Sequence, residues 1–375
     1  MRHAVTIKPQ WTIRHPTGGT LVPRLVDLLV QVHEDGSLLS ACQHAGTSYR
    51  HAWGLVRQGE ALFGAPLLRM ERGKGSTLTP LAEKLVWADR RIAARLSPML
   101  DSLASELEVE IEKVLSAVPA LLRIQANHGF AVEKLHELLT KAQVPVDLKY
   151  VGSQEAVVAL HAGECDVSGF PVPIGNYEQP VVEYYRRWLD RREHCVIHVA
   201  TRRQGLMLAP GNPKRIYSLK DLARPGVRYI NRQQGSGTRL LLDLMLAHEA
   251  VDRSRITGYT QCEYTHAAVA AYVASGMADA GLGVETPARR FRLEFLPLQT
   301  ENYFLLCRRP ALESPLVQDL LRVLRDPAFS KAVNELPGYD AARAGEVKAV
   351  DAELPGLKHR PRAGKRIDKP AHPKT

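Results

Sequence analysis

Residues 37–80 place two short helical patterns directly before a glycine-rich hairpin, in the order SLLSACQHAGTSYRHAWGLVRQGEALFGAPLLRMERGKGSTLTP. The first helical pattern covers 37–44 and is broken at Gly46. The second begins at Thr47 or Ser48, because either side chain can cap a backbone N–H that has no partner inside the helix. This order of elements predicts a fold that presents one helix to a DNA major groove.

The second helical pattern separates apolar from polar positions. Its apolar residues recur at steps of three and four and are expected to face a core: Ala52, Leu55, Val56 and Leu62. The polar residues of its first turns and outer side are expected to bind DNA: Ser48, Tyr49, Arg50, His51 and Arg57. After Phe63-Gly64, LLRM and TLT are expected to form a wing whose tip binds phosphate or a minor groove through Arg72, Lys74 and Ser76.

The motifs SYRHAW and LFGAPLLRMERGKGSTLTPLAEKL resemble the winged helix-turn-helix of the molybdate-responsive regulators and, more loosely, of the LysR-type regulators. The resemblance keeps its order and spacing over about residues 20–90. It implies that residues 1–80 are a winged helix-turn-helix domain that binds double-stranded DNA. The alternative is a helical hairpin in an ordinary core.

The segment before this motif is expected to support it. Residues 1–18 predict an extended lead-in, with a candidate strand through VTIKP and with Trp11 packed on the domain. A helical stripe then ends at Gly36 and is formed by Leu21, Leu25, Leu28, Leu29 and Val32.

A long helical segment follows from Pro80 to about Ser116, with a possible kink at Pro98. Its apolar face comprises Leu81, Leu85, Ile92, Leu96, Leu103, Leu107, Ile111 and Leu115. A small domain has no core to cover such a face, so residues 81–118 are predicted to be a linker and dimerisation helix that pairs with a second chain. A homodimer or tetramer would then bind an inverted-repeat operator. Packing within one chain is the alternative.

Beyond Pro119, short apolar runs alternate with helical patterns, which is typical of an α/β sheet. Crossing strands would join two lobes, as in the type II periplasmic-binding-protein fold. The runs GSGTR, ASGMADAGLG and FLPLQTENYFLL resemble a binding-protein-like domain of molybdenum-related regulators, over about residues 120–345. The fold class is therefore α/β multidomain, with a two-lobed effector domain over residues 119–350.

Strand ends that lead into helices can bind an anion through free N–H groups. The candidate ligand-binding residues lie at four such places: Asn127, His128, Ser153, Arg232, Ser236, Gly237, Thr238, Arg239, Thr265 and His266. Two of them, Arg232 and Arg239, flank the glycine loop and can contact an oxyanion with two N–H groups. The resemblance implies molybdate, tungstate or a molybdenum-cofactor-like anion as effector. A plain turn also explains the glycines.

Motifs for catalysis are missing from the sequence: it has no GxSxG, no Walker lysine after GSGT and no HExxH. No catalytic residue, metal site or cofactor is predicted, and the five cysteines have neither zinc spacing nor a disulfide framework. Two alternatives stay open, a molybdopterin-handling carrier or enzyme that uses its front domain for assembly, and an architectural DNA-binding factor. No secretory signal or membrane span is found, so we expect a cytoplasmic protein.

The net charge of +10 is concentrated at the two ends of the chain. Residues 1–80 hold nine Lys/Arg against five Asp/Glu, and residues 358–375 hold seven against one. Residues 351–375 are predicted to be a basic disordered tail, either a solvated end or an aid to non-specific DNA attraction. We therefore expect a ligand-responsive transcription regulator without enzymatic activity.

Overall fold

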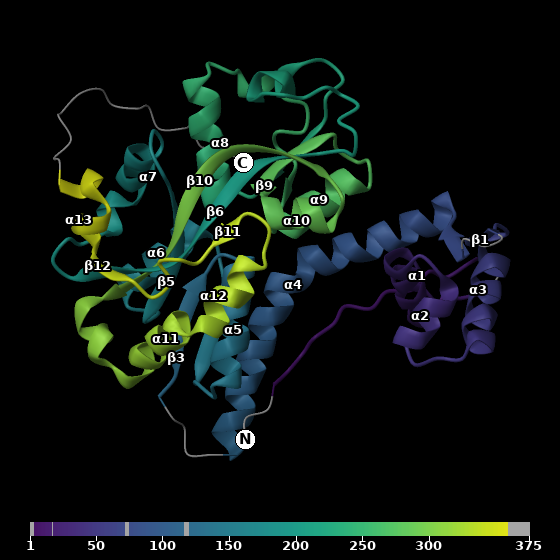
Figure 1. The fold of residues 1–375 in the computed structure, drawn as a ribbon, viewed down its shortest axis with the longest axis horizontal. Helices are drawn as coiled ribbons and strands as arrows, with labels where there is room; N and C mark the ends of the chain where they lie inside the picture. The colour runs from purple at the N-terminus through teal and green to yellow at the C-terminus, as the bar shows by residue number, and fades with distance from the viewer. Residues whose placement is uncertain (1–3, 17, 72–74, 116–119, 359–375) are drawn as a thin grey trace.

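The computed structural model describes residues 4–16, 18–71, 75–115 and 120–358. Figure 1 shows a small helical head set apart from a larger α/β body and joined to it along one long helix, α4 (Pro80–Leu115). Among the described residues, no helix has the length and apolar character that crossing a bilayer requires.

The head is the expected winged helix-turn-helix. Its elements are α1 (Pro23–Asp35), α2 (Leu38–His44), α3 (Tyr49–Phe63), β1 (Leu68–Glu71) and β2 (Gly75–Leu78). The two strands of the wing pair antiparallel, with Leu68 opposite Leu78.

Local capping explains where the helices of the head begin and end. The hydroxyl of Ser37 accepts a hydrogen bond from Ser40 N at the start of α2, and that of Ser48 accepts one from His51 N at the start of α3. Gly36 and Gly64 end α1 and α3 in the left-handed conformation, which glycine adopts without steric cost. Of the two predicted caps, Ser48 is the one used.

The core of the head lies where α3 crosses α1. Ala52 and Val56 are buried there as predicted, whereas Leu55 and Leu62 are only partly buried. A Cβ on Gly59 would lie 2.3 Å from Leu25 Cδ2, so a glycine is needed for the two helices to approach this closely.

The predicted strand through VTIKP is wrong. The lead-in is extended but forms only one β-bridge, between Arg14 and Thr20. Its polar groups bond to α4 instead, since Trp11 Nε1 donates to Asp89 Oδ1 (2.8 Å) and Val5 N to Glu108 Oε1 (2.7 Å). Two carboxylates of α4 thus accept hydrogen bonds from the lead-in, where a neighbouring strand was expected to pair with it.

Helix α4 packs within its own chain, against α1, β4 and α9. The prediction that no part of the same chain covers the apolar face of this helix is therefore wrong in part. Leu85 is buried in the head, and Ala104 is buried against the body. A row of apolar side chains on the same helix stays exposed, formed by Met99, Leu103 and Leu107.

The body is built on one mixed sheet of ten strands in the order β4-β3-β5-β10-β6-β9-β7-β8, with β11 and β12 beside β6. The strands are β3 (Leu122–Ala126), β4 (Val146–Tyr150), β5 (Val167–Pro173), β6 (His194–Leu208), β7 (Tyr229–Arg232), β8 (Cys262–Glu263), β9 (Ala280–Val284), β10 (Glu294–Arg308), β11 (Tyr339–Asp340) and β12 (Val347–Ala349). The helices are α5 (Phe130–Lys141), α6 (Ser153–Ala162), α7 (Glu178–Tyr185), α8 (Gly237–His248), α9 (His266–Ala274), α10 (Glu285–Arg290), α11 (Pro315–Arg325), α12 (Pro327–Asn334) and α13 (Val350–Glu353).

Two lobes share this sheet. Lobe 1 comprises β3, β4 and β5 with α5 on one face and α6 on the other, and lobe 2 comprises β7, β8 and β9 with α8 and α9. The long antiparallel strands β6 and β10 run from one lobe into the other (Figure 1). At this crossing the buried Arg202 and Glu301 form an ion pair (2.7 Å), to which Gln204 adds a hydrogen bond of 2.9 Å. The expected two-lobed domain is confirmed.

The end of the described chain corrects the predicted tail. Disorder was expected from residue 351, but residues 350–358 form α13 and a 3₁₀ turn at Pro355–Lys358. Val350, Leu354 and Leu357 are buried in lobe 1, at helical spacing that the basic composition of the tail obscured. Residues 359–375 lie outside the described part.

Candidate functional site

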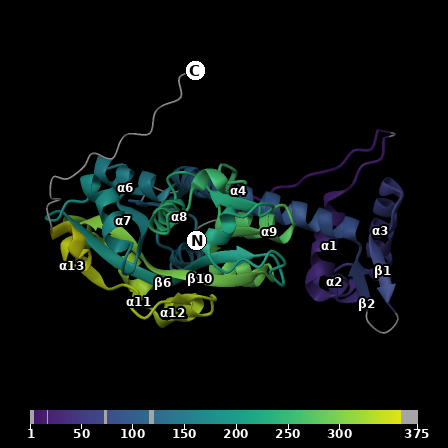
Figure 2. The ribbon, with the colours of Figure 1, turned by 90° about the horizontal axis from the view of Figure 1, so that it is seen from above.

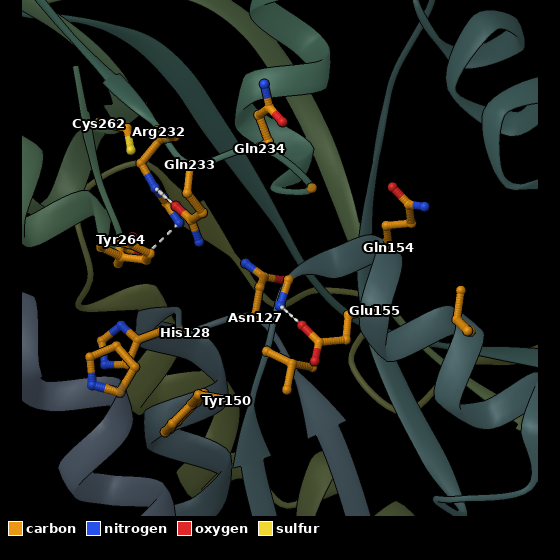
Figure 3. A pocket seen from close by; sticks show the side chains of 15 residues that line it. Asn127, His128, Tyr150, Gln154, Glu155, Arg232, Gln233, Gln234, Cys262 and Tyr264 are labelled. Atoms are coloured by element: carbon orange, nitrogen blue, oxygen red, sulfur yellow. Dashed lines mark hydrogen bonds between the residues drawn. The ribbon is translucent and has the colours of Figure 1, made fainter. Parts of the chain in front are cut away.

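A cleft of about 660 Å³ lies between the lobes (Figure 3). Lobe 1 lines it with Asn127, His128, Tyr150, Gln154 and Glu155. Lobe 2 lines it with Arg232, Gln233, Gln234, Cys262 and Tyr264. One residue of α4, Pro98, lines it as well. A volume of this size suits a small organic molecule.

The cleft is formed where strands lead into helices, as expected. Ser153 starts α6 after β4, Ser236 caps α8 after β7, and Thr265 caps α9 after β8. The two lobes touch at these ends: Gln154 N donates to Gly235 O (3.3 Å), and Gly237 N donates to Ser153 Oγ (3.4 Å). The lobes are therefore closed at one edge of the cleft.

Arg232 is a buried cation that forms no ion pair with an acidic side chain of the described residues. Its side chain is 2% exposed, its Nε donates to Gln233 Oε1 (3.1 Å) and its Nη2 to Tyr264 O (3.0 Å), contacts that Figure 3 shows as dashed lines. Among the described residues, no group accepts a hydrogen bond from Nη1. Burial and then the positive charge of Arg202 lower the pKa of Arg232 to about 9. An anion in the cleft would supply the missing negative charge.

Two more buried polar groups near Arg232 have an atom free. His266 Nδ1 accepts from Val284 N (3.4 Å), while its Nε2 and Asn127 Oδ1 have no partner within the described residues. Burial, followed by repulsion from Arg232 and Arg202, holds the pKa of His266 well below its usual value. The imidazole is therefore neutral at pH 7 and adds no charge to the site.

His128 connects lobe 1 to the linker helix. Its Nε2 lies 3.0 Å from Glu133 Oε1 and 3.3 Å from Ser97 Oγ of α4, and its ring packs on that of Tyr150. Burial raises the pKa of Glu133, but the hydrogen bond with His128 and the nearby positive charges together outweigh burial, so the pKa is lowered.

The predicted ligand residues fall into three groups. Three line the cleft, namely Asn127, His128 and Arg232. Six are buried around it without lining it, namely Ser153, Ser236, Gly237, Thr238, Thr265 and His266. Arg239 does not line the cleft either, because its guanidinium pairs with Asp243 (3.2 Å) and lies over the ring of Tyr259.

Several lining residues were missed by sequence reasoning. They are Pro98, Tyr150, Gln154, Glu155, Gln233, Gln234, Cys262 and Tyr264. A signal existed for three of them, since Gln233-Gln234 directly precedes the glycine loop and Tyr264 directly precedes a helix cap. Pro98 gave no such signal, because nothing in the sequence brings the linker helix to the cleft.

The predicted DNA-binding residues of α3 form an exposed group. Ser48, Tyr49, Arg50, His51 and Arg57 are all exposed. Tyr49 stacks on Trp53, and Arg57 lies over the same indole at 5.5 Å. Figure 2 shows α3 and the wing on the side of the head that faces away from the body, so neither lobe covers these residues.

Two of the three predicted wing residues, Arg72 and Lys74, lie outside the described part of the chain. The third, Ser76, is buried, and its hydroxyl accepts a hydrogen bond from Leu38 N (3.3 Å). The prediction that Ser76 contacts DNA is therefore wrong, because the residue joins the wing to α2.

Over residues 4–16, 18–71, 75–115 and 120–358, no three His, Cys, Asp or Glu side chains are arranged to hold a metal ion. The five cysteines are free thiols: Cys42, Cys165, Cys195, Cys262 and Cys307.

Comparison with known proteins identifies the body. The PBP superfamily domain matches residues 135–325. The uncharacterized protein YvgK of Bacillus subtilis (strain 168) is 33% identical over 202 residues, which are 53% of this chain. That match spans 64% of YvgK, just under two thirds of its length. An uncharacterized protein from the 5′ region of a 2Fe-2S ferredoxin gene in Clostridium pasteurianum is 30% identical over 109 residues, 29% of this chain and 96% of its own length.

Among solved structures, the full-length hypochlorite-specific LysR-type regulator HypT of Salmonella typhimurium aligns with a TM-score of 0.42 and 15% identity. The alignment covers 80% of this chain and 96% of that one.

Proposed function

The chain belongs to the PBP superfamily domain family, and from this premise we propose that it is a ligand-responsive, DNA-binding transcription regulator that works in the cytoplasm and is not an enzyme. The head would bind double-stranded DNA, the cleft would bind a small anionic effector, and α4 would connect the two.

One observation carries the DNA-binding role: α3 presents its N-terminal turn away from the body, with polar side chains that the rest of the protein leaves open (Figure 2). Among the described residues, neither Arg50 nor His51 has a side-chain partner. Base edges and phosphates are the partners that such polar and cationic side chains meet at the start of a recognition helix.

The effector role rests on Arg232. A buried guanidinium with two neutral partners and one free Nη1 is unfavourable in the empty protein, and an anion would remove that penalty. We propose an anionic effector, for which molybdate, tungstate and a molybdenum-cofactor-like compound are the candidates that the sequence resemblance suggests. Asn127 and Gln233 line the same cleft and can donate amide N–H groups to it.

The exposed row of Met99, Leu103 and Leu107 supports self-association through α4. These side chains lie four residues apart, so they form one apolar strip that a second chain could cover. We propose a homodimer, alone or within a tetramer, that binds an inverted-repeat operator with its two heads.

Regulation would follow from differential binding. A ligand changes the DNA-bound population only if it prefers one arrangement of the lobes over another. The crossing strands β6 and β10 allow such a change, since each belongs to both lobes.

A carrier or enzyme that handles molybdopterin would be the competing role. Turnover of a molybdenum-cofactor precursor by the purified protein would identify that role, and we expect none.

Selection of DNA from a random library by the full-length protein, followed by footprinting, tests the proposed function directly. We expect a protected inverted repeat with half-sites about one helical turn apart. Binding of all sequences with equal affinity would instead support an architectural factor, and no binding would end the proposal.

A further inference from the structure

Helix α4 forms hydrogen bonds with both lobes of the body, and the change from one lobe to the other occurs near Pro98. Before Pro98, Lys84 Nζ donates to Ser275 O (2.9 Å) and Thr265 Oγ1 donates to Ala94 O (2.9 Å), both in lobe 2. After Pro98, α4 accepts from the edge strand of lobe 1: Tyr150 N donates to Ser102 Oγ (2.9 Å). One turn later, Leu148 N donates to Ser105 Oγ (3.0 Å). The helix therefore crosses from one lobe to the other at Pro98.

The hydrogen bond from Thr265 follows from the chemistry of proline. Proline has no N–H, so Ala94 O, four residues before Pro98, has no partner inside the helix. The buried hydroxyl of Thr265 supplies the missing donor while it also caps α9. The interruption in α4 is thus bonded to a helix start of lobe 2 beside the cleft.

The cleft consequently has three walls. Pro98 lines it together with Tyr264 of lobe 2 and Tyr150 of lobe 1. The adjacent Ser97 touches His128, a further lining residue, at 3.3 Å. A ligand that fills the cleft would contact α4 directly.

The size of the cleft limits the ligand. At about 30 Å³ for each water-sized group, an anion of four oxygens fills roughly 120 Å³. The cleft measures about 660 Å³, and much of its lining is apolar or aromatic, including Val151, Val158 and the two tyrosines Tyr150 and Tyr264. A bare oxyanion at Arg232 would leave this surface in contact with water only.

We infer that the site takes an organic anion whose acidic group binds Arg232 and whose unsaturated body reaches the Pro98 turn of α4. This inference rests on the proposed function and deepens it, because it makes α4 a part of the ligand site. Since α4 is bonded to lobe 2 through residues before Ser97 and to lobe 1 from Ser97 onward, a ligand that changes the angle between the lobes bends α4 around Pro98. The head at the end of α4 then changes its direction.

Phenyl phosphate and inorganic phosphate form a matched pair of probes, because they differ by one aromatic ring. Calorimetry with the full-length protein should show phenyl phosphate binding about tenfold or more tightly than phosphate or molybdate, as expected for burying a ring. Tyr264→Ala, at a half-exposed position, should reduce this preference by about tenfold and leave phosphate binding unchanged.

Pro98→Ala should weaken phenyl phosphate binding severalfold, whereas Glu110→Ala, further along α4 and outside the cleft, should have no effect. Equal affinity for phosphate and phenyl phosphate, tighter binding of molybdate, or no binding of phenyl phosphate at millimolar concentration would overturn the inference. Molybdate binding that needs Arg232 and is at least as tight as that of phenyl phosphate would overturn it while leaving the proposed regulator intact. Failure of the DNA selection would instead remove the regulator and leave the ligand assignment standing.

Discussion

The head and the cleft each present an arginine that has no carboxylate partner among the described residues, and the two arginines differ in their surroundings. Arg50 is exposed on the first turn of α3, where water solvates its charge. Arg232 is buried at the cleft, where burial and the nearby Arg202 lower its pKa. An unpaired arginine costs little stability when it is exposed to water. An unpaired arginine that is buried destabilises the protein unless a ligand supplies the opposite charge.

This difference predicts two kinds of binding. Binding of DNA to the head should add charge contacts that salt screens, without a large change in the stability of the head. Binding of an anion to the cleft should stabilise the body, because it compensates a charge that is already desolvated.

Replacement of Arg232 should produce the largest effect. Arg232→Met keeps the volume of the side chain and removes the unpaired charge, so we expect the free energy of unfolding of the empty protein to rise by about 1–4 kcal/mol. Anion binding should be lost. Denaturant unfolding and calorimetry measure the two quantities.

Arg239→Met is the matched control for this variant, because Arg239 pairs with Asp243. It should lower stability and leave anion binding unchanged. The pH dependence sharpens the comparison. The destabilisation caused by Arg232 is fully present below its lowered pKa of about 9 and lessens as the pH rises toward the ordinary pKa of arginine. The difference in free energy of unfolding between Arg232→Met and wild type should therefore shrink above pH 9. A destabilised Arg232→Met protein would contradict the account.

In the head, Arg50→Ala should weaken binding to the selected DNA by about 1–3 kcal/mol if the guanidinium binds a guanine. Its effect on scrambled DNA should be small. Lys74→Ala, in the segment between β1 and β2, should weaken binding to both DNAs alike and reduce the salt dependence of binding. Gel shifts with both DNAs provide the measurement, and equal losses on each for Arg50→Ala would exclude base recognition.

The connection between the two regions can be tested by a double-mutant cycle on Thr265 and Pro98. Thr265→Val leaves Ala94 O without its donor and should destabilise the protein by about 1–3 kcal/mol. Pro98→Ala restores an N–H to α4, so in that background the cost of Thr265→Val should fall by about 1 kcal/mol. Strict additivity would show that the hydroxyl does not compensate for the proline.

The smallest expected effect belongs to Ser76→Ala. Loss of the hydrogen bond with Leu38 N should cost about 1 kcal/mol of stability, and DNA affinity should stay within roughly twofold of wild type. Anisotropy with labelled DNA and thermal unfolding separate these outcomes. A drop in DNA affinity at unchanged stability would restore the original assignment of Ser76 to the DNA surface.

Local patterns predicted the head well, because its elements are defined by neighbours in sequence. The cap Ser48, the stop at Gly36 and the buried Ala52 and Val56 all follow from spacing and helix-end chemistry. Ser76 was misassigned because a short polar residue in a basic loop gives no sign of a partner 38 positions earlier.

The cleft was predicted less completely. Arg232, Asn127 and His128 were found because they lie where strands lead into helices, but Pro98, Tyr150 and Tyr264 were not. Their place depends on the path of α4 across both lobes, which is set by contacts such as that of Thr265 with Ala94, 171 residues apart. Similarly, the apolar face of α4 suggested a second chain, and no sequence pattern indicated that the body would cover part of it.

The effect of a cleft ligand on DNA binding tests the central claim most directly. The affinity of the full-length protein for its selected DNA should be measured with and without saturating phenyl phosphate, in wild type and in Arg232→Met. The account predicts that the ligand changes the affinity of wild type by about fivefold or more and leaves that of Arg232→Met unchanged. The same DNA affinity in all four measurements would contradict the claim that the cleft controls the head.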